Sequence, residues 1–480
     1  MTGPKRTILW LLALTMFLVV LDSAIINVAL PAIKSALGFT QSSLQWVLTA
    51  YILTFGGFLM LAGRAADLYG RRRILVAGIA GFVLFSFLTG VSTSSGMLIA
   101  MRALQGLAGA LMAPTALSIL LATFTGDQER NRALSVWSIV ASGGAAAGVF
   151  LGGLLTQYLG WRWCFFVNVP IGIFAIFAIL RVVPAHVAES RDKHLDLPGA
   201  ILITGGLMSL VYALTLAPTL GWGNPWTLTW LAVAAELLAA FIFNERRAQH
   251  PLVPFSIFRI RNLSGANFMM LPMMAGALGM FFFTSLFIQN VLGFSPLKTG
   301  FAFLPVPVII GVLSYQAPKF LGRFGVKNLL VACTVLTTIG VYLMSFVTAS
   351  SNYFTNILPA FVLLGVGFGI AFVAVFVAAT AGVPPEESGL ASGLINTTQQ
   401  IGAALGLAIL AVVAGATTKS ALAAGQPLPA ATILGYQRAF LASAILMALA
   451  IAIAVFVIRE PAPAHMPEPS PALEPESAVK

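Results

Sequence analysis

The chain has 480 residues, of which 59% are hydrophobic and 9% are charged, and its formal net charge is +11. Soluble globular proteins carry about 25% charged residues, so this chain has too few polar side chains to keep its surface in water. Together with the mean hydropathy of +0.95, this excludes a soluble enzyme and a nucleic-acid-binding protein. We attribute the positive charge to Lys and Arg residues in loops, which orient membrane helices.

Residues that commonly bind metals or cofactors are scarce. Cys164 and Cys333 lie far apart in apolar runs, which is typical of small core residues and gives neither a disulfide framework nor metal-ligand spacing. The four His residues fall in polar segments or in the C-terminal tail, and no phosphate-binding P-loop is present. The sequence therefore predicts no metal site, no cofactor and no ATP hydrolysis within this chain.

Long apolar runs recur along the chain, and a helix needs about 20 apolar residues to cross a bilayer. They predict an all-α integral membrane protein with fourteen spans. The first span is too long for a cleaved signal peptide. In chain order, the predicted spans are 8–30, 44–63, 74–94, 97–122, 133–157, 163–183, 199–217, 226–243, 264–290, 298–317, 327–348, 354–378, 388–414 and 437–458.

The loops predict the orientation of these spans. If the N-terminus is cytoplasmic, most of the 26 Lys and Arg residues fall on the cytoplasmic side, as the positive-inside rule requires. An even number of spans then returns the C-terminus to the cytoplasm. Residues 461–480 are rich in Pro, Ala, Glu and Ser, so we expect a disordered cytoplasmic tail.

Three segments carry motifs. They are LDSAIINVALP at 21–31, GRAADLYGRRR at 63–73 and WRWCFFVNVPIG at 161–172. These segments, in this order and on these sides of the membrane, resemble the signatures of the major facilitator superfamily and of its fourteen-helix drug:proton antiporters.

The resemblance implies a division of the chain into two related bundles. They are an N-terminal six-helix bundle at 1–185 and a C-terminal six-helix bundle at 263–460, with a helix pair at 186–262 inserted between them. The tail at 461–480 follows. Transport would then proceed by rocking of the two bundles around a central cavity.

Asp22 and Glu236 are the acidic residues that lie well inside predicted spans. An ionised carboxylate is costly there, so it usually faces a cavity, forms a pair or titrates. We expect Asp22 to bind and release a proton, and the alternative is a fixed acid that holds helices together. Glu236 is either a second protonation site or a carboxyl group kept neutral near lipid.

Arg102 lies in the fourth span, in a segment that resembles the fourth-helix motif of the family. The resemblance implicates this arginine in proton transfer. We expect Arg102 to lie close enough to Asp22 to tune its proton affinity, and the alternative is a permanent structural ion pair.

The resemblance gives the 63–73 loop a different role, which is to latch the two bundles together in the outward-facing state. Arg130 is the expected partner of Asp67. Ala65 and Leu68 replace a larger apolar residue and a basic residue of the motif, which weakens the expected latch. The alternative is that the basic residues only set the topology. The residues assigned to this latch are Gly63, Asp67, Gly70, Arg71, Arg72 and Arg130.

The fifth span contains glycines four residues apart, which let another helix approach closely. This pattern resembles the antiporter motif, although Val149 stands where the family usually has proline. We therefore expect the glycine packing face to be kept, while the bend that proline would cause is not assured. The residues of this face are Gly144, Gly148, Gly152 and Gly153.

Polar residues within the other spans are candidates for a substrate cavity. Because acids are scarce among them, neutral or monocationic amphiphiles suit such a cavity better than dications. The candidates are Asn27, Tyr51, Gln289, Asn290, Tyr315, Asn396 and Gln400.

These features predict a transporter, and not an enzyme, that exports hydrophobic small molecules such as drugs in exchange for protons. The alternatives are a narrow exporter of one metabolite or lipid, or an importer, on the same fold. The resemblance favours the bacterial cytoplasmic membrane. The expected partners are the lipid bilayer, the substrate and protons, without nucleic acid, and the oligomeric state stays open, a monomer included.

Overall fold

The computed structural model describes residues 3–40, 43–124, 127–184, 196–249, 251–384 and 387–460. These residues form helices and connecting turns, and no strand occurs among them. Fourteen helical segments in the described part of the chain are long and apolar enough to cross a membrane. The predicted all-α fold with fourteen spans is confirmed. The predicted disordered tail, 461–480, lies outside the described residues.

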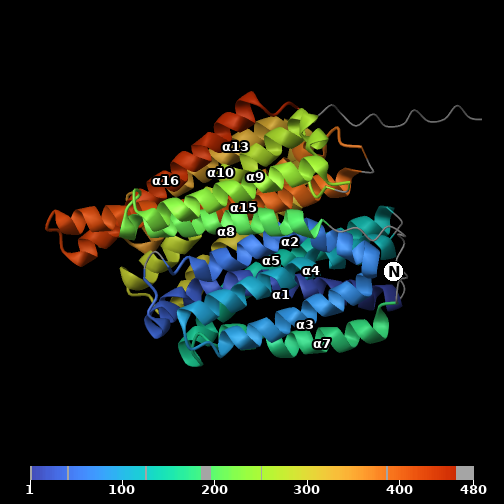
Figure 1. Cartoon of the computed structure of the whole chain (residues 1–480), viewed down its shortest axis with the longest axis horizontal. Coiled ribbons are helices and arrows are strands. Elements are labelled where there is room, and N and C mark those ends of the chain that lie inside the picture. Colours follow the sequence, from blue (N-terminus) through green and yellow to red (C-terminus); the bar gives the residue numbers. More distant parts are fainter. Residues whose placement is uncertain are drawn as a thin grey trace, which may run out of the picture.

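Successive spans run in alternate directions (Figure 1). We call the end of the molecule that carries Gly3 the near end and the end that carries Leu37 the far end. The first six spans consist of α1 (Gly3–Leu37), α2 (Trp46–Tyr69), α3 (Arg71–Gly90), α4 (Ser95–Thr123), α5 (Asp127–Tyr158), and the pair α6 (Trp163–Phe166) and α7 (Asn168–Val182). The next two spans are α8 (Leu197–Leu220) and α9 (Pro225–Arg247).

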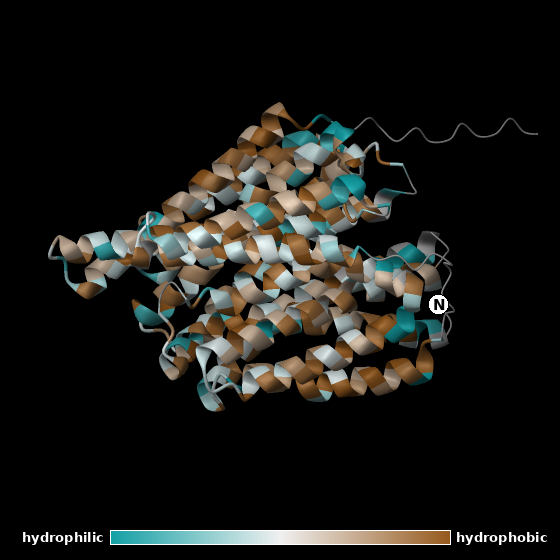
Figure 2. Ribbon diagram, viewed as in Figure 1, coloured by the Kyte–Doolittle hydropathy of each residue, from teal (hydrophilic) through white to brown (hydrophobic). Residues whose placement is uncertain are grey.

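A short 3₁₀ helix, η1 (Phe255–Arg259), leads into the last six spans. These spans consist of α10 (Arg261–Asn290), α11 (Pro296–Phe303) with α12 (Pro305–Phe324), α13 (Val326–Met344), η2 (Tyr353–Ile357) with α14 (Leu358–Thr380), α15 (Ser388–Ala423) and α16 (Leu428–Phe456). Figure 2 shows that hydrophobic residues dominate these helices along their length, as a lipid environment requires.

The helices pack in two groups. Helices α1 to α7 contact mainly one another, and so do α10 to α16. Between the groups, α2 packs against α15, and α5 packs against α11 and α12. The predicted boundary at 185 lies outside the described residues, and the division into bundles at 185 and 262 stays a prediction.

The inserted pair α8–α9 lies where the two groups meet (Figure 1). Helix α8 contacts both α2 and α15, and α9 packs along α8. A small buried cluster joins the three helices, with Leu53 on α2, Val211 on α8 and Ala404 on α15. A change in the arrangement of the two groups would therefore alter the contacts of α8 with α2 and α15.

Two spans differ most from their predicted bounds. Helix α15 continues past residue 414 to Ala423, and α16 begins at Leu428 and not at 437. Together they form a hairpin that projects at the far end (Figure 1). Hydropathy marks the part of a helix that lipid surrounds, whereas a helix can continue beyond the bilayer wherever its residues have good helix propensity.

Candidate functional site

Asp22 and Arg102 form a fully buried ion pair between α1 and α4. Arg102 Nη1 donates to Asp22 Oδ2 over 2.6 Å, and both residues have 0% exposure. The predicted proximity of the two residues is confirmed. Because a buried charge needs a partner and hydrogen bonds, these two groups depend on each other.

Two further amides complete the site around Asp22. Gln105 Nε2 and Asn168 Nδ2 each donate to Asp22 Oδ1 over 2.9 Å, and Asn168 Nδ2 also lies 3.1 Å from Ser86 Oγ. Asp22 thus accepts from α4 and α7, and the network extends to Ser86 on α3. Three donors surround its two oxygens, so this conformation is built for the carboxylate form.

Neither Gln105 nor Asn168 is among the residues predicted from the sequence, although both lie in segments that resemble family motifs. Gln105 follows Arg102 by three residues, which places the two side chains on one helix face. Asn168 is the amide of the 161–172 motif. An amide within an apolar span needs a hydrogen-bond partner. Both positions therefore indicated a polar contact inside the bundle.

We expect Asn168→Leu, which keeps the branched shape of the side chain, to lower the free energy of unfolding by about 1.5–3 kcal/mol, because it removes a hydrogen bond to a charged group. Thermal unfolding in detergent would measure the change. Asn328→Leu is the matched control, because Asn328 is exposed and bonds only to the carbonyl oxygen of Phe324 on the preceding turn. Equal stability of the two variants would contradict the prediction.

Arg102 has other partners besides Asp22. Its Nε donates to the carbonyl oxygen of Val47 over 3.1 Å, and its Nη1 also donates to Gln105 Oε1 over 2.7 Å. The ring of Tyr51 lies beneath the guanidinium, with its centroid 4.2 Å from Cζ, a distance that allows a cation–π interaction. Tyr51 is therefore buried in this site, and the guanidinium can be held even when Asp22 is neutral.

The predicted glycine face of α5 packs against α1 next to Asp22. A Cβ at Gly148 would lie 2.8 Å from the carbonyl oxygen of Leu21, and one at Gly152 would lie 2.5 Å from that of Ile25. Gly144 faces Phe17 in the same way. Helix α5 runs without interruption through Val149. This close packing makes α1 and α5 one unit.

Gly153 faces across to the second group of helices at the far end. A Cβ there would lie 2.6 Å from the carbonyl oxygen of Pro296, and one at Gly300 would lie 2.6 Å from that of Val149. The backbones of α5 and α11 thus touch. The far ends of the two groups are closed against each other along this line.

Helix α10 closes the same end against α1. Ser285 Oγ donates to the carbonyl oxygen of Asn27 over 2.5 Å, and Gln289 Nε2 donates to that of Val28 over 3.0 Å. At about 1.5 Å per residue, Asn27 is about 8 Å along α1 from Asp22. Two predicted cavity residues, Asn27 and Gln289, therefore belong to the interface between the groups in this conformation.

The remaining candidates for the substrate cavity lie in separate places. Asn290 is at the far end of α10, Tyr315 is 72% exposed on α12, and Asn396 Nδ2 donates to the carbonyl oxygen of Ser392 on its own helix. Gln400 packs its Cβ against Gly56 of α2. The structure does not bring these residues together, and their role in binding stays a prediction.

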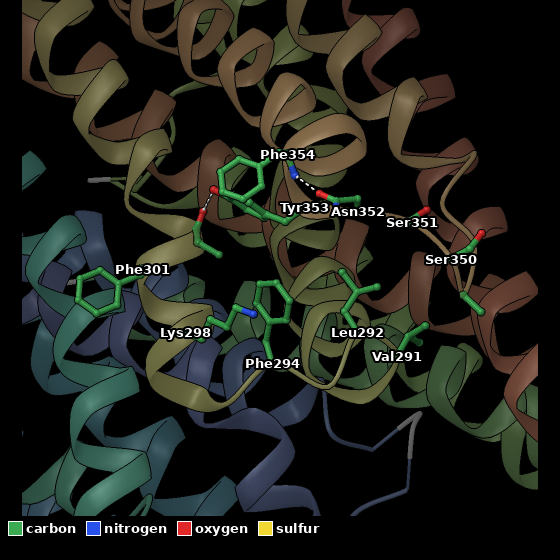
Figure 3. Close-up of a pocket in the computed structure, with 12 residues that line it drawn as sticks. Val291, Leu292, Phe294, Lys298, Phe301, Ser350, Ser351, Asn352, Tyr353 and Phe354 are labelled. Carbon is green, nitrogen blue, oxygen red and sulfur yellow. Dashed lines mark hydrogen bonds between the residues drawn. The ribbon is translucent and has the colours of Figure 1, made fainter.

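A cavity of about 560 Å³ opens at the far end of the second group (Figure 3). Lys298 Nζ lies 3.8 Å from the centre of the Phe294 ring, and Tyr353 Oη donates to the carbonyl oxygen of Ala302 over 2.9 Å. None of the predicted cavity residues lines this space. It is therefore separate from the site around Asp22.

Two of the predicted latch residues, Arg72 and Arg130, bond within the first group of helices. Arg72 Nη2 donates to the carbonyl oxygen of Leu180 on α7, and Arg130 Nε lies 3.4 Å from that of Phe124. Gly70 has a φ of 95° and turns the chain sharply from α2 into α3, while Gly63 faces Pro114 of α4. The side chain of Asp67 is not described, so its predicted pairing with Arg130 is not tested. Arg71 begins α3.

An ion pair connects α1 and α5 at the near end. Lys5 Nζ and Glu129 Oε2 are 2.8 Å apart, and the hydrogen bond from Lys5 lowers the pKa of Glu129. Because a lowered folded-state pKa stabilises only the ionised form, the contribution is present at neutral pH and is lost as the pH falls through that pKa. The pair is partly exposed, so the contribution is small.

Glu236 lies on an exposed face near the middle of α9, and α9 packs along α8, not against α1 or α4. It is not part of the site around Asp22.

We expect Glu236→Gln to keep the export rate within about twofold, because most surface substitutions change free energies by less than about 0.5 kcal/mol. Export from vesicles would measure this, and a loss similar to that of an Asp22 variant would restore Glu236 as a second protonation site.

Comparisons with known proteins agree with this architecture. A model of the Major Facilitator Superfamily matches residues 12–407. A solved bacterial homologue of the human lysosomal transporter Spinster superposes with a TM-score of 0.69 at 16% identity, covering 96% of this chain and 100% of that chain. At this identity, the similarity shows the fold alone.

Two curated relatives are similar over nearly their whole length. The chain is 40% identical over 440 residues to the puromycin resistance protein of Streptomyces alboniger, covering 90% of this chain and 87% of that protein. It is 38% identical over 455 residues to the cephamycin export protein of Amycolatopsis lactamdurans, covering 94% and 92%.

The chain is therefore a multi-pass membrane protein that belongs to the major facilitator superfamily of transporters. Within that superfamily it groups with antibiotic-resistance and antibiotic-export proteins of the drug:proton antiporter type.

Proposed function

We propose that this protein exports hydrophobic or amphiphilic antibiotics from a bacterial cell in exchange for protons, and that Asp22 is the proton-binding group. The single observation that supports the proposal most directly is the buried Asp22–Arg102 pair. Asp22 lies on α1, the helix that also contacts α10 at the far end. In this proposal the near end faces the cytoplasm, and the protein resides in the cytoplasmic membrane.

Proton binding at Asp22 competes with Arg102 for the same carboxylate. When a proton occupies Asp22, the ion pair is lost and the guanidinium rests on Val47, Gln105 and Tyr51, which already hold it. When the proton leaves, Arg102 and the amides of Gln105 and Asn168 again donate hydrogen bonds to the carboxylate of Asp22. Each exchange changes which helices α1 is bound to.

Helix α1 transmits this exchange to the far end. Asp22 sits between the contacts of Gly148 and Gly152, so α5 follows α1. Both helices contact the second group at the far end, through Ser285 on Asn27 and through Gly153 on Pro296. Once the far-end interface is open, a proton from that side can bind Asp22 and loosen α1 from α4, so that the drug leaves as the proton enters. The proton is released on the near side after the far end has closed.

The proposal is tested in inside-out membrane vesicles in which respiration has built a proton gradient. A ΔpH dye reports proton release while a panel of amphiphilic compounds, including puromycin and a cephamycin, is added. We expect several compounds to release protons, since a cavity with few charges binds by apolar contact. A response to one compound alone would favour a narrow exporter, and the absence of any response would contradict proton-coupled export.

A further inference from the structure

A pair of buried acids lies at the near end of the inserted helices. Asp196 precedes α8 and is 8% exposed, and Glu245 is in the last turn of α9 and is 4% exposed. A Cβ built on Gly199 would lie 2.5 Å from Asp196 Oδ2 and 2.9 Å from Glu245 Oε1. The two oxygens thus face the same small space beside Gly199.

No described cation pairs with these two carboxyl groups. On the helices packed around them, the charged side chains near this end are Arg64 on α2, Glu387 at the start of α15, and Arg246 and Arg247 on α9. None of them contacts either acid within ion-pair distance, and Arg247 lies over the ring of Phe243. Arg191, Lys193, His194 and His250 are outside the described residues, and the side chain of Asp67 on α2 is not described. Two buried carboxylates this close repel each other when both are ionised, so a proton shared between them is favoured.

The hydrogen bonds differ between the two acids. Asp196 Oδ1 accepts from the backbone N–H of Gly199, and Asn244 Nδ2 donates to both Asp196 oxygens over 2.9 and 2.8 Å. Asp196 is also the N-cap of α8. Glu245 Oε2 accepts from Val253 N over 2.9 Å, whereas Oε1 is buried without a hydrogen-bond partner.

We propose that Asp196 and Glu245 form a second proton-binding site, in which Glu245 Oε1 carries a proton and donates it in a hydrogen bond to Asp196 Oδ2. The site is separate from Asp22 and lies on the inserted helix pair. Its existence does not depend on the transported substrate.

The proton on Glu245 stabilises the segment between α9 and η1, which leads to the second group of helices. Glu245 bonds to Val253, which is in the segment between α9 and η1. When the proton is lost at alkaline pH, the two carboxylates repel each other, Glu245 turns away from Asp196 and its bond to Val253 N is lost. The near-side pH thereby controls whether α9 holds the start of the second group.

Infrared spectroscopy of the purified full-length chain tests this site, because a protonated carboxyl group has its own carbonyl band. We expect wild type to show a band at neutral pH that disappears as the pH is raised, and Glu245→Gln to lack it. Glu129→Gln is the matched control and should keep the band, because Glu129 is ionised next to Lys5 at neutral pH.

Asp196→Asn provides an independent readout if Glu245→Gln does not fold. Without the charge of Asp196, Glu245 should lose its proton at a lower pH, so the loss of the band should shift to lower pH. A band that is unchanged by both substitutions, or no protonated band assignable to Glu245, would overturn the proposal. Neither readout measures transport, so failure here is distinct from failure of the export mechanism.

Discussion

Replacing Asp22 with Asn should lower the free energy of unfolding by about 3–5 kcal/mol, because it leaves the fully buried guanidinium of Arg102 without its counter-charge. Replacing both residues, as Asp22→Asn with Arg102→Met, should recover most of this loss, since a neutral pair of similar volume is often as stable as a buried ion pair. Thermal unfolding of the single and double variants measures the recovery.

The same variants separate stability from proton coupling. If Asp22 carries the proton, the double variant should fold well and still fail to release protons when drug is added. A double variant that regains both stability and drug-dependent proton release would show that the pair is only structural. The Arg102→Met single variant completes the cycle, from which the coupling energy of the two residues follows.

Adding one methyl group at Gly153 should shift the transporter away from the conformation seen here. A Cβ at this position would meet backbone atoms of Pro296 and Leu297 at 2.6 and 2.9 Å, and backbone cannot move aside as a flexible side chain can. Overpacking of this kind costs about 1–3 kcal/mol. Because the contact exists only when the far end is closed, Gly153→Ala should favour the open far end by about 5–150-fold.

Accessibility of a cysteine at the far-end interface measures this shift. Val28 is fully buried there, so Val28→Cys should react slowly with a membrane-impermeant thiol reagent, and faster once Gly153→Ala is added. Gly143→Ala is the matched control on the same helix, because a Cβ at Gly143 has nothing within 4 Å. Equal labelling with either substitution would contradict the role of Gly153 in closure.

The helix count and the identity of the central pair could be predicted because both depend on strong local signals. Apolar length marks a span, and an acid or arginine within an apolar run requires a partner. Asp22 and Arg102 are the charged residues of the first and fourth spans, and the structure pairs them. The glycines of the fifth span likewise predicted close helix packing, now seen against Leu21 and Ile25.

Other features could not be predicted because they depend on which helix faces which. Hydropathy placed Glu236 inside a span, as the structure does, but could not show that it lies on an exposed face of α9. Glu245, at the end of the same helix, is buried against Asp196. The polar residues proposed for one cavity, such as Tyr315 and Asn396, face different directions because helix rotation is set by packing, which a single sequence does not reveal.

The most direct test of the central claim is simultaneous measurement of drug and proton flux in liposomes that contain only the purified chain. A pH gradient would be imposed, and the most active compound from the vesicle panel would be followed together with internal pH. We predict that wild type moves drug against protons and that Asp22→Asn with Arg102→Met, folded and equally incorporated, moves neither. Continued proton movement with drug in the double variant would contradict proton coupling through Asp22.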